Sequence, residues 1–293
     1  MQEFLQQVVG GLATGSIFAS LALALVLIYR SMNVMNFAQG EMAMLSTFVA
    51  WQLVSMGVPM WIAFGITLVL AFIGAFVIER LVIRPVERAP QLTLVIVCLG
   101  LLIVCNGIAG WIWGYTIKNF PSPFPATAIN VGGVSLSLQD LGVIGVSLLT
   151  LIAIYLLFQK TKLGLALRAA ALYPEQSRLM GIRVSWMLAI GWGLAAVVGA
   201  VSGIMVAPVV FLEPNMMQGI LVYAFAAAVL GGVESPIGAV IGGLLLGVIL
   251  ALVGTYVDFI GTNLRLPAAF AIIVLVLLIR PAGLFGRVHV RRV

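Results

Sequence analysis

Long apolar stretches separated by short polar segments run through most of this 293-residue chain. A helix that crosses a membrane needs about 20 apolar residues, and stretches near that length recur between residues 8 and 279. The pattern predicts an all-α, polytopic transmembrane bundle of about nine spans, within a range of about eight to ten. The expected spans are residues 8–29, 42–56, 60–78, 92–114, 141–158, 185–207, 217–230, 237–257 and 266–279.

Two of these stretches are shorter than a full span. Residues 217–230 and 266–279 each correspond to about 21 Å of helix, whereas the hydrocarbon core of a bilayer is about 30 Å thick. Each is therefore expected either to cross part of the membrane or to use polar flanking residues.

Composition agrees with a membrane protein. The chain is 63% hydrophobic and 8% charged, whereas soluble domains carry about 25% charged residues. The spans leave no room for a separate soluble domain, so residues 1–293 are expected to form one transmembrane domain. The first apolar stretch has neither a basic segment before it nor a small-residue cleavage site, and it is expected to be a retained span.

The longest polar segment is residues 159–184, which contain five cations: Lys160, Lys162, Arg168, Arg178 and Arg183. It cannot lie in hydrocarbon, and its charge predicts a cytoplasmic position. Two short helices are expected, the first over 163–172 and the second starting at Pro174, with Glu175 in its first turn and Gly181 as its cap. Such a segment either docks onto another protein or is an ordered loop whose cations set the topology, and the segment alone favours the loop.

The cations are sorted between the two sides of the expected membrane. All Lys and Arg residues except Lys118 and Arg265 fall on the side of residues 159–184. The positive-inside rule therefore predicts an N-terminus outside and a C-terminus in the cytoplasm. The same sorting explains the net charge of +6, and no nucleic-acid partner is expected.

No catalytic motif is present in the sequence. There is no phosphate-binding loop, zinc-protease motif or nucleophile elbow, and the single histidine lies in the C-terminal tail. Cys98 and Cys105 lie within one span, where cysteines behave as small hydrophobic residues. We expect no enzyme activity, cofactor or metal, so any ATP-driven function would need ATPase activity from another chain.

Few polar residues fall within the expected spans. Glu41 is the best candidate for a translocation path, although an interfacial residue at a helix start is the favoured alternative. Asn33, Asn36, Gln39 and Asn106 are further candidates, each equally consistent with hydrogen bonds between helices. The scarcity of ionisable groups disfavours coupling to a driving ion.

Pairs of glycines four residues apart predict close helix contacts. Gly11 and Gly15 form one pair in the first span, and Gly199 and Gly203 form another. Residues 237–257 contain two such pairs, Gly238 with Gly242 and Gly243 with Gly247, and are expected to form a central, closely packed helix.

Residues 35–41, MNFAQGE, resemble the NFAHGE signature of the permeases in branched-chain amino acid ABC importers. Similar matches follow in order along nearly the whole chain, and the chain resembles the shorter of the two permease types. Gln39 stands where the family often has His, and Glu234 stands where it often has Gly. The other matches are Glu79-Arg80, Arg84-Pro85-Val86, Leu163-Gly164, Arg168-Ala169, Met180-Gly181-Ile182, residues 227–232, Gly238-Ala239, Gly242-Gly243 and residues 280–286.

The resemblance implies a multi-pass permease of the bacterial inner membrane that carries branched-chain or related amino acids. Its partners would be two cytoplasmic ATPase subunits, an external substrate-binding protein and a second permease, either a homologue or another copy. Residues 159–184 would couple the permease to the ATPase. The residues expected to serve coupling are Gly164, Arg168, Pro174, Glu175 and Gly181. Urea or short-chain amides as cargo, and a stand-alone channel, remain as alternatives.

Overall fold

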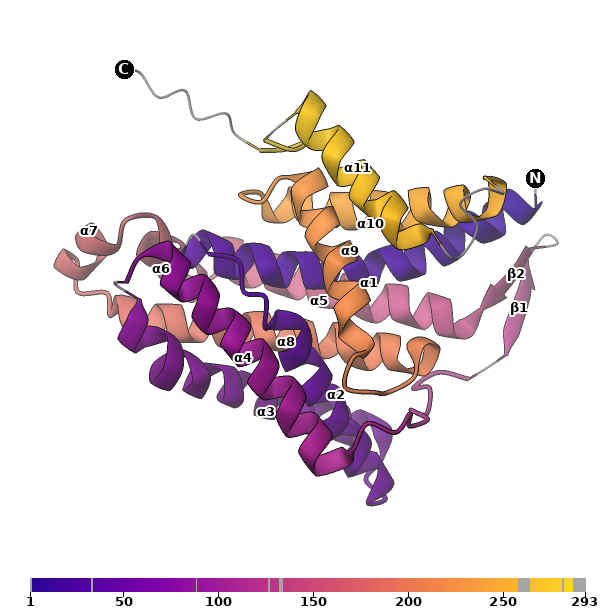
Figure 1. Cartoon of the computed structure of the whole chain (residues 1–293), viewed down its shortest axis with the longest axis horizontal. Helices are drawn as coiled ribbons and strands as arrows, with labels where there is room; N and C mark the ends of the chain where they lie inside the picture. The colour runs from indigo at the N-terminus through magenta and orange to yellow at the C-terminus, as the bar shows by residue number, and fades with distance from the viewer. Residues whose placement is uncertain are drawn as a thin grey trace.

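The computed structural model describes residues 2–32, 34–87, 89–125, 127–131, 134–257, 264–280 and 282–286. Asn33, Arg88 and the tail cations Arg287, Arg291 and Arg292 lie outside these residues. The described part is an α-helical bundle with one small hairpin, so the predicted all-α class is confirmed (Figure 1). Its helices are α1 (Gln2–Met32), α2 (Gln39–Ser55), α3 (Met60–Ile78), α4 (Gln91–Trp113), α5 (Leu138–Lys160), α6 (Lys162–Leu172), α7 (Pro174–Leu179), α8 (Val184–Val210), α9 (Met216–Gly231), α10 (Pro236–Tyr256) and α11 (Arg265–Ile279).

Every expected span forms a helix, but not every helix is long enough to cross a bilayer. Within the described residues, six helical segments have the length and apolarity needed, namely α1, α3 with its extension to Val86, α4, α5, α8 and α10. The prediction of about nine full spans is therefore supported only in part. Helices α9 and α11 are short, as expected, with 16 and 15 residues, and α2 is also short, with 17.

The polar sequence at the amino-terminal end of α2 lies inside the protein. After α1 ends, the connection runs back into the bundle before α2 begins (Figure 1). Asn36, Ala38 and Gln39 in this connection have no exposed surface. The amide of Gln39 donates to the carbonyl oxygen of Ala195 in α8 over 2.9 Å, which satisfies a polar group that would otherwise be costly to bury.

The glycines of α10 predict close packing, and in the structure α10 packs closely against α1. A side chain added at Gly11 would place its Cβ 2.8 Å from the Cα of Val248, and at Gly15 it would lie 3.0 Å from the carbonyl oxygen of Gly243. On another side of α10, a Cβ at Gly242 would overlap the carbonyl oxygen of Ala227 in α9. Because these glycines lack side chains, the backbones of three helices approach one another.

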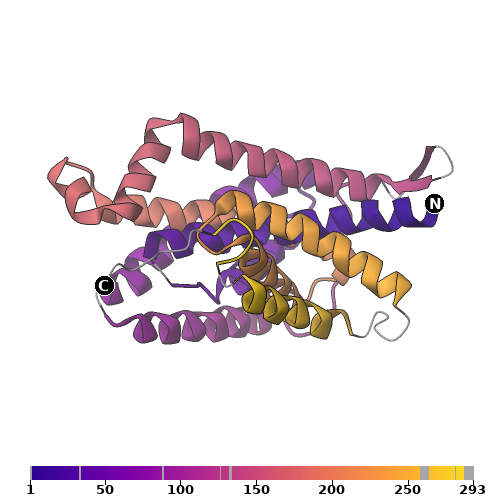
Figure 2. The ribbon, with the colours of Figure 1, turned by 90° about the horizontal axis from the view of Figure 1, so that it is seen from above.

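The two ends of the bundle differ in structure. Figure 2 shows the N-terminus at one end and α6 and α7 at the other. The N-terminal end also carries the antiparallel hairpin of β1 (Ala128–Val131) and β2 (Val134–Ser137), in which Ala128 pairs with Ser137. At the opposite end, α3 continues through a π-helical turn (Glu79–Ile83) and a 3-10 turn (Arg84–Val86) toward α4.

Candidate functional site

A pair of short helices, α6 and α7, lies at one end of the bundle, and together with their flanks we call them the α6–α7 segment (residues 161–183). Both helices form where the sequence predicts them. Thr161 caps α6 by accepting a hydrogen bond from the backbone N–H of Gly164 over 3.0 Å. A Cβ at Gly164 would overlap the carbonyl oxygen of Leu157, so glycine lets α6 turn sharply against the end of α5.

Helix α7 begins and ends at the residues that local chemistry favours. Pro174 occupies its first turn, where a missing N–H costs nothing. Gly181 has a φ of +82°, a left-handed conformation that suits glycine. The N–H of Gly181 donates to Arg178 O over 3.0 Å, and the N–H of Ile182 donates to Ser177 O over 2.9 Å. These two bonds form a Schellman cap, which confirms the predicted end of the helix.

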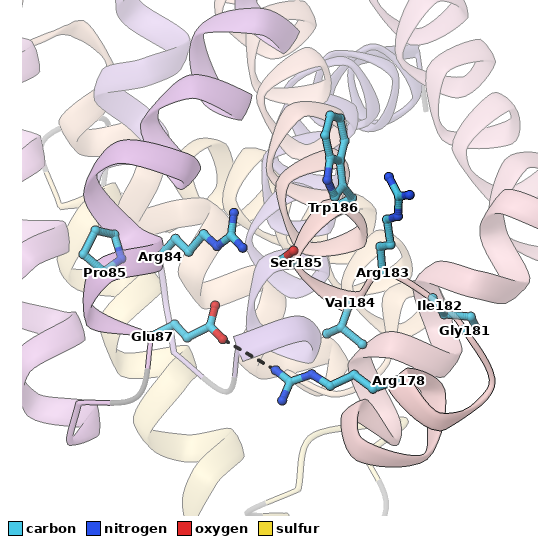
Figure 3. A pocket seen from close by; sticks show the side chains of 10 residues that line it. All are labelled: Arg84, Pro85, Glu87, Arg178, Gly181, Ile182, Arg183, Val184, Ser185 and Trp186. Atoms are coloured by element: carbon cyan, nitrogen blue, oxygen red, sulfur yellow. Dashed lines mark ion pairs between the residues drawn. The ribbon is translucent and has the colours of Figure 1, made fainter.

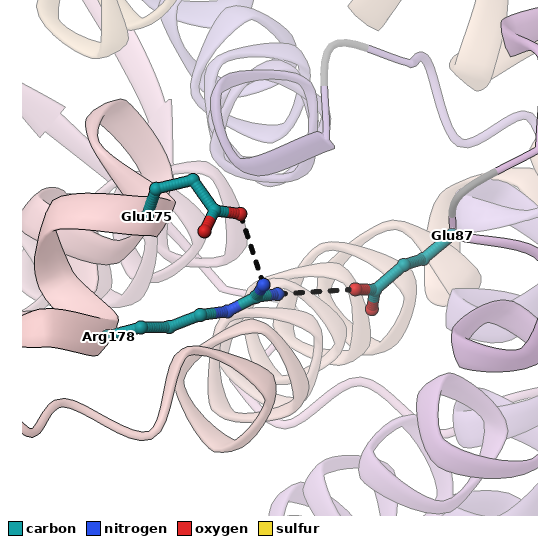
Figure 4. Close-up of polar contacts among 3 residues, drawn as sticks. All are labelled: Glu87, Glu175 and Arg178. Carbon is teal, nitrogen blue, oxygen red and sulfur yellow. Dashed lines mark hydrogen bonds and ion pairs between the residues drawn. The ribbon is translucent and has the colours of Figure 1, made fainter.

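Arg178 connects α7 to the connection between α3 and α4 (residues 79–90). Its guanidinium lies 3.1 Å from Glu175 Oε1, one turn earlier in α7, and 3.9 Å from Glu87 Oε1 (Figure 4). Both ion pairs lie at the end that carries α6 and α7. The two segments are therefore held together by one shared arginine.

A groove of about 750 Å³ lies between the α3–α4 connection, the end of α7 and the start of α8. Arg84, Arg178, Arg183 and Glu87 line it, so cations outnumber carboxylates on its walls (Figure 3). Trp186 forms another part of the wall, and the guanidinium of Arg80 stacks over its ring at 4.3 Å. This contact fixes the end of α3 against the start of α8.

The structure separates the five predicted coupling residues into two groups. Pro174, Glu175 and Gly181 belong to α7 and its cap. Gly164 and Arg168 belong to the corner between α5 and α6, where Arg168 donates to Gln159 Oε1 over 3.0 Å. Arg168 therefore faces back toward α5 and lines a different groove, which it shares with Arg30 and Glu234.

Sequence reasoning missed the two most exposed apolar side chains of the α6–α7 segment. Leu179 is 88% exposed and Met180 is 83% exposed, and both lie at the tip formed by the end of α7. Because the surrounding turn is polar and charged, this apolar pair is available for contact with another protein. The sequence signal that could have indicated them is an apolar pair directly before the capping glycine, Gly181.

Arg178→Ala is expected to loosen α7 while leaving the bundle folded. Exposed ion pairs contribute about 0.2 to 1 kcal/mol each, so the free energy of unfolding should fall by about 1 kcal/mol or less. Amide hydrogen exchange in α7 should speed up several-fold, because its link to Glu87 is lost. Arg183→Ala is the matched control, since Arg183 lines the same groove and makes no ion pair with any described residue. If the amides of α7 exchange equally fast in both variants, Arg178 does not hold α7 against Glu87.

A second candidate site is a partly buried polar network that joins α2, α4 and the α8–α9 connection. The side-chain amide of Asn106 in α4 donates toward Glu41 Oε2 at 3.3 Å, Pro214 O at 2.9 Å and Asn215 Oδ1 at 3.1 Å. Gln218 in α9 also donates to Asn215 Oδ1, over 3.1 Å. The sequence interpretation had not selected Asn215 or Gln218 as path residues.

The other two path candidates occupy a different environment. Asn36 Oδ1 accepts from the N–H of Ala38 over 3.0 Å, and Asn36 Nδ2 lies 3.4 Å from Gln39 Oε1. Together with the bond from Gln39 to Ala195, these contacts hold the buried turn before α2 against α8. Asn36 and Gln39 therefore have structural partners, whereas Glu41 and Asn106 connect to exposed residues.

Residues 7–280 match the family described as branched-chain amino acid transport system / permease component. The high-affinity branched-chain amino acid transport system permease protein LivH of Escherichia coli K12 is 31% identical over 99% of this chain and 98% of its own length. The corresponding protein BraD of Pseudomonas aeruginosa is 29% identical over the same shares of the two chains.

A solved structure shares the fold at lower sequence similarity. The PsaBC complex from Streptococcus pneumoniae, solved with a Fab, matches with a TM-score of 0.51 at 15% identity. The match covers 95% of this chain and 92% of the other. This similarity concerns the fold alone.

Proposed function

Because the chain belongs to the family of permease components of branched-chain amino acid transport systems, we propose that it forms the membrane path through which an ATP-driven importer moves branched-chain amino acids into the cell. It is a multi-pass membrane permease and not itself an enzyme. Its cargo is proposed from the family and from the names of relatives that match over nearly their whole length.

The end that carries α6 and α7 is proposed to face the cytoplasm, with the N-terminus outside and the chain acting as a single permease domain. The distribution of cations supports this orientation. Among the described residues, Lys118 and Arg265 are the cations that the positive-inside rule assigns to the outside. The cations at the opposite end include Arg30, Lys160, Lys162 and the arginines of the α6–α7 segment and its groove.

The α6–α7 segment is proposed to fit a groove on an ATPase subunit and to transmit its closure to the permease. The observation that carries this proposal is the exposed apolar tip at Leu179 and Met180, positioned by a capped helix and tethered through Arg178. A well-ordered helical segment can transmit the movement of an ATPase subunit to the permease, whereas a flexible loop cannot. Residues 159–184 thus act as the coupling loop.

The remaining partners follow from the same proposal. Two ATPase subunits would supply the energy, a second permease or another copy would complete the path, and an external binding protein would deliver the cargo. The exposed apolar faces of α3, α4 and α5 support contact with a second permease and with lipid.

Replacing residues 161–183 by a Gly/Ser linker of equal length is the experiment that tests the coupling role. In proteoliposomes containing the permeases, ATPases and binding protein, leucine uptake should fall to background and the ATPases should no longer co-purify. The matched control replaces residues 128–137 at the opposite end, and it should retain the ATPases. Co-purification that survives loss of the α6–α7 segment would contradict the proposal.

The same preparation separates the alternatives. Uptake of urea or an amide in place of leucine would change the proposed cargo, and the proposal of an ATP-driven importer would remain. Leucine flux through the permeases without ATPase would instead support a channel.

A further inference from the structure

We infer that the carboxylate of Glu41 binds the ammonium group of the amino acid during its passage through the membrane. This inference rests on the proposed function, because it requires a cargo that carries an ammonium group. It assigns a chemical role to one residue of the partly buried polar network that joins α2, α4 and the α8–α9 connection.

Glu41 is a buried acid without a cation. Its side chain lies in the first turn of α2, and the residue is 2% exposed. No described Lys or Arg lies within ion-pair distance of it. A buried carboxylate is costly unless a positive charge or several hydrogen bonds compensate it, so the site is suited to a cation that arrives from elsewhere.

The hydrogen-bond donor to Glu41 is Asn106, which also donates to Pro214 and Asn215. The Asn106 amide carries two hydrogens and faces three acceptors, of which Glu41 is the most distant at 3.3 Å. The amide can therefore remain bonded to Pro214 and Asn215 when a stronger donor approaches the carboxylate. An ammonium group offers three donors and a full charge, and charge-assisted bonds are roughly twice as strong as neutral ones.

The amino-terminal end of α2 favours a negative charge at this position. Glu41 lies two residues after the start of the helix, where the helix dipole stabilises anions. A side chain added at Gly40 would contact Leu221 of α9 at 3.3 Å, which places the start of α9 beside the same turn. The start of α2 is thus packed against α9, while the carboxylate of Glu41 accepts from Asn106 of α4.

A line of polar groups connects Glu41 to the protein surface. It runs from Glu41 through the half-buried Asn106 to the exposed Asn215 and Gln218. The α8–α9 connection that carries Asn215 is also paired with the segment before the hairpin, through reciprocal bonds of 2.9 and 3.0 Å between Lys118 and Leu212. The line therefore opens beside the loops of the end proposed as outside, from which the cargo would arrive.

The test compares isosteric variants that differ in charge. Leucine uptake and ATP hydrolysis are measured in proteoliposomes containing the complete importer with its binding protein. Glu41→Gln keeps an acceptor for Asn106 and removes the charge, and it should lower leucine uptake at least tenfold. ATP hydrolysis stimulated by the binding protein should stay within twofold of the unmodified importer, because the α6–α7 segment is unchanged.

A second pair of variants keeps the inference testable if Glu41→Gln folds poorly. Glu41→Asp should transport several-fold faster than Glu41→Asn, since these two side chains differ mainly in charge. Glu3→Gln, an exposed acid at the start of α1, should leave uptake unchanged.

Two results would overturn the inference. The first is leucine uptake by the neutral variants that matches the charged ones, which would leave the proposed function intact. The second is uptake of urea and not leucine by the unmodified importer, since a neutral cargo has no ammonium group for Glu41, and that result would overturn the proposed cargo as well.

Discussion

The double variant Leu179→Asp/Met180→Asp is expected to separate the permease from its ATPase. Burying a leucine or methionine side chain contributes about 1.5 to 3 kcal/mol, and an unpaired carboxylate in its place adds a further penalty. Since about 1.4 kcal/mol corresponds to a tenfold change in affinity, association should weaken at least 100-fold. Leucine uptake should fall with it.

The permease itself should remain folded in this variant, because both side chains are almost fully exposed and form no part of the core. Thermal unfolding of the purified permease and co-purification of the ATPase are the two measurements. Met56→Asp is the matched control, because Met56 is 70% exposed in a turn after α2. Retention of the ATPase by the double variant would place the docking surface elsewhere.

The α6–α7 segment shows what a sequence can predict. Helix α7 is specified by signals that act within a few residues, namely Pro174 in its first turn, Glu175 beside it and Gly181 with its positive φ. Such signals do not depend on the rest of the fold. The bounds and the cap of α7 could therefore be predicted, while the tether from Arg178 to Glu87 could not, because its partner lies in a different connection.

The burial of the start of α2 could not be predicted from the local sequence. A polar sequence after an apolar span resembles an ordinary loop, and hydropathy gives no sign that it turns back into the protein. Its burial depends on Ala195, which is 156 residues away. The same limit applies to Glu41, whose burial and whose partners in α4 and the α8–α9 connection become visible only in three dimensions.

Glycine spacing was a better guide, because close helix contact needs small residues on one face. The pairs in α1 and α10 predicted that these helices would pack, and they do so backbone to backbone. The spacing did not indicate which helix each face contacts. Gly199 and Gly203 of α8, for example, face α2, where Cβ atoms would lie 2.6 Å from Gln39 Nε2 and 2.8 Å from Ala43 O.

Gly247→Leu is expected to cause the largest loss of stability of any single substitution considered for this chain. A Cβ at Gly247 would overlap the Cα of Gly15 in α1, and backbone atoms cannot move aside as a flexible side chain can. The two helices would have to separate. Overpacking a core costs about 1 to 3 kcal/mol, and we expect about 3 kcal/mol or more here because the obstruction is backbone.

The control for this prediction is Gly107→Leu in α4, where an added Cβ would have no neighbour within 4 Å. That variant should be neutral or slightly stabilising, because glycine in a helix interior costs about 1 kcal/mol relative to a good helix former. Thermal unfolding in detergent and size-exclusion profiles measure both variants. If Gly247→Leu unfolds at the same temperature as Gly107→Leu, then α1 and α10 do not approach at this position, and the central packing of the bundle would need revision.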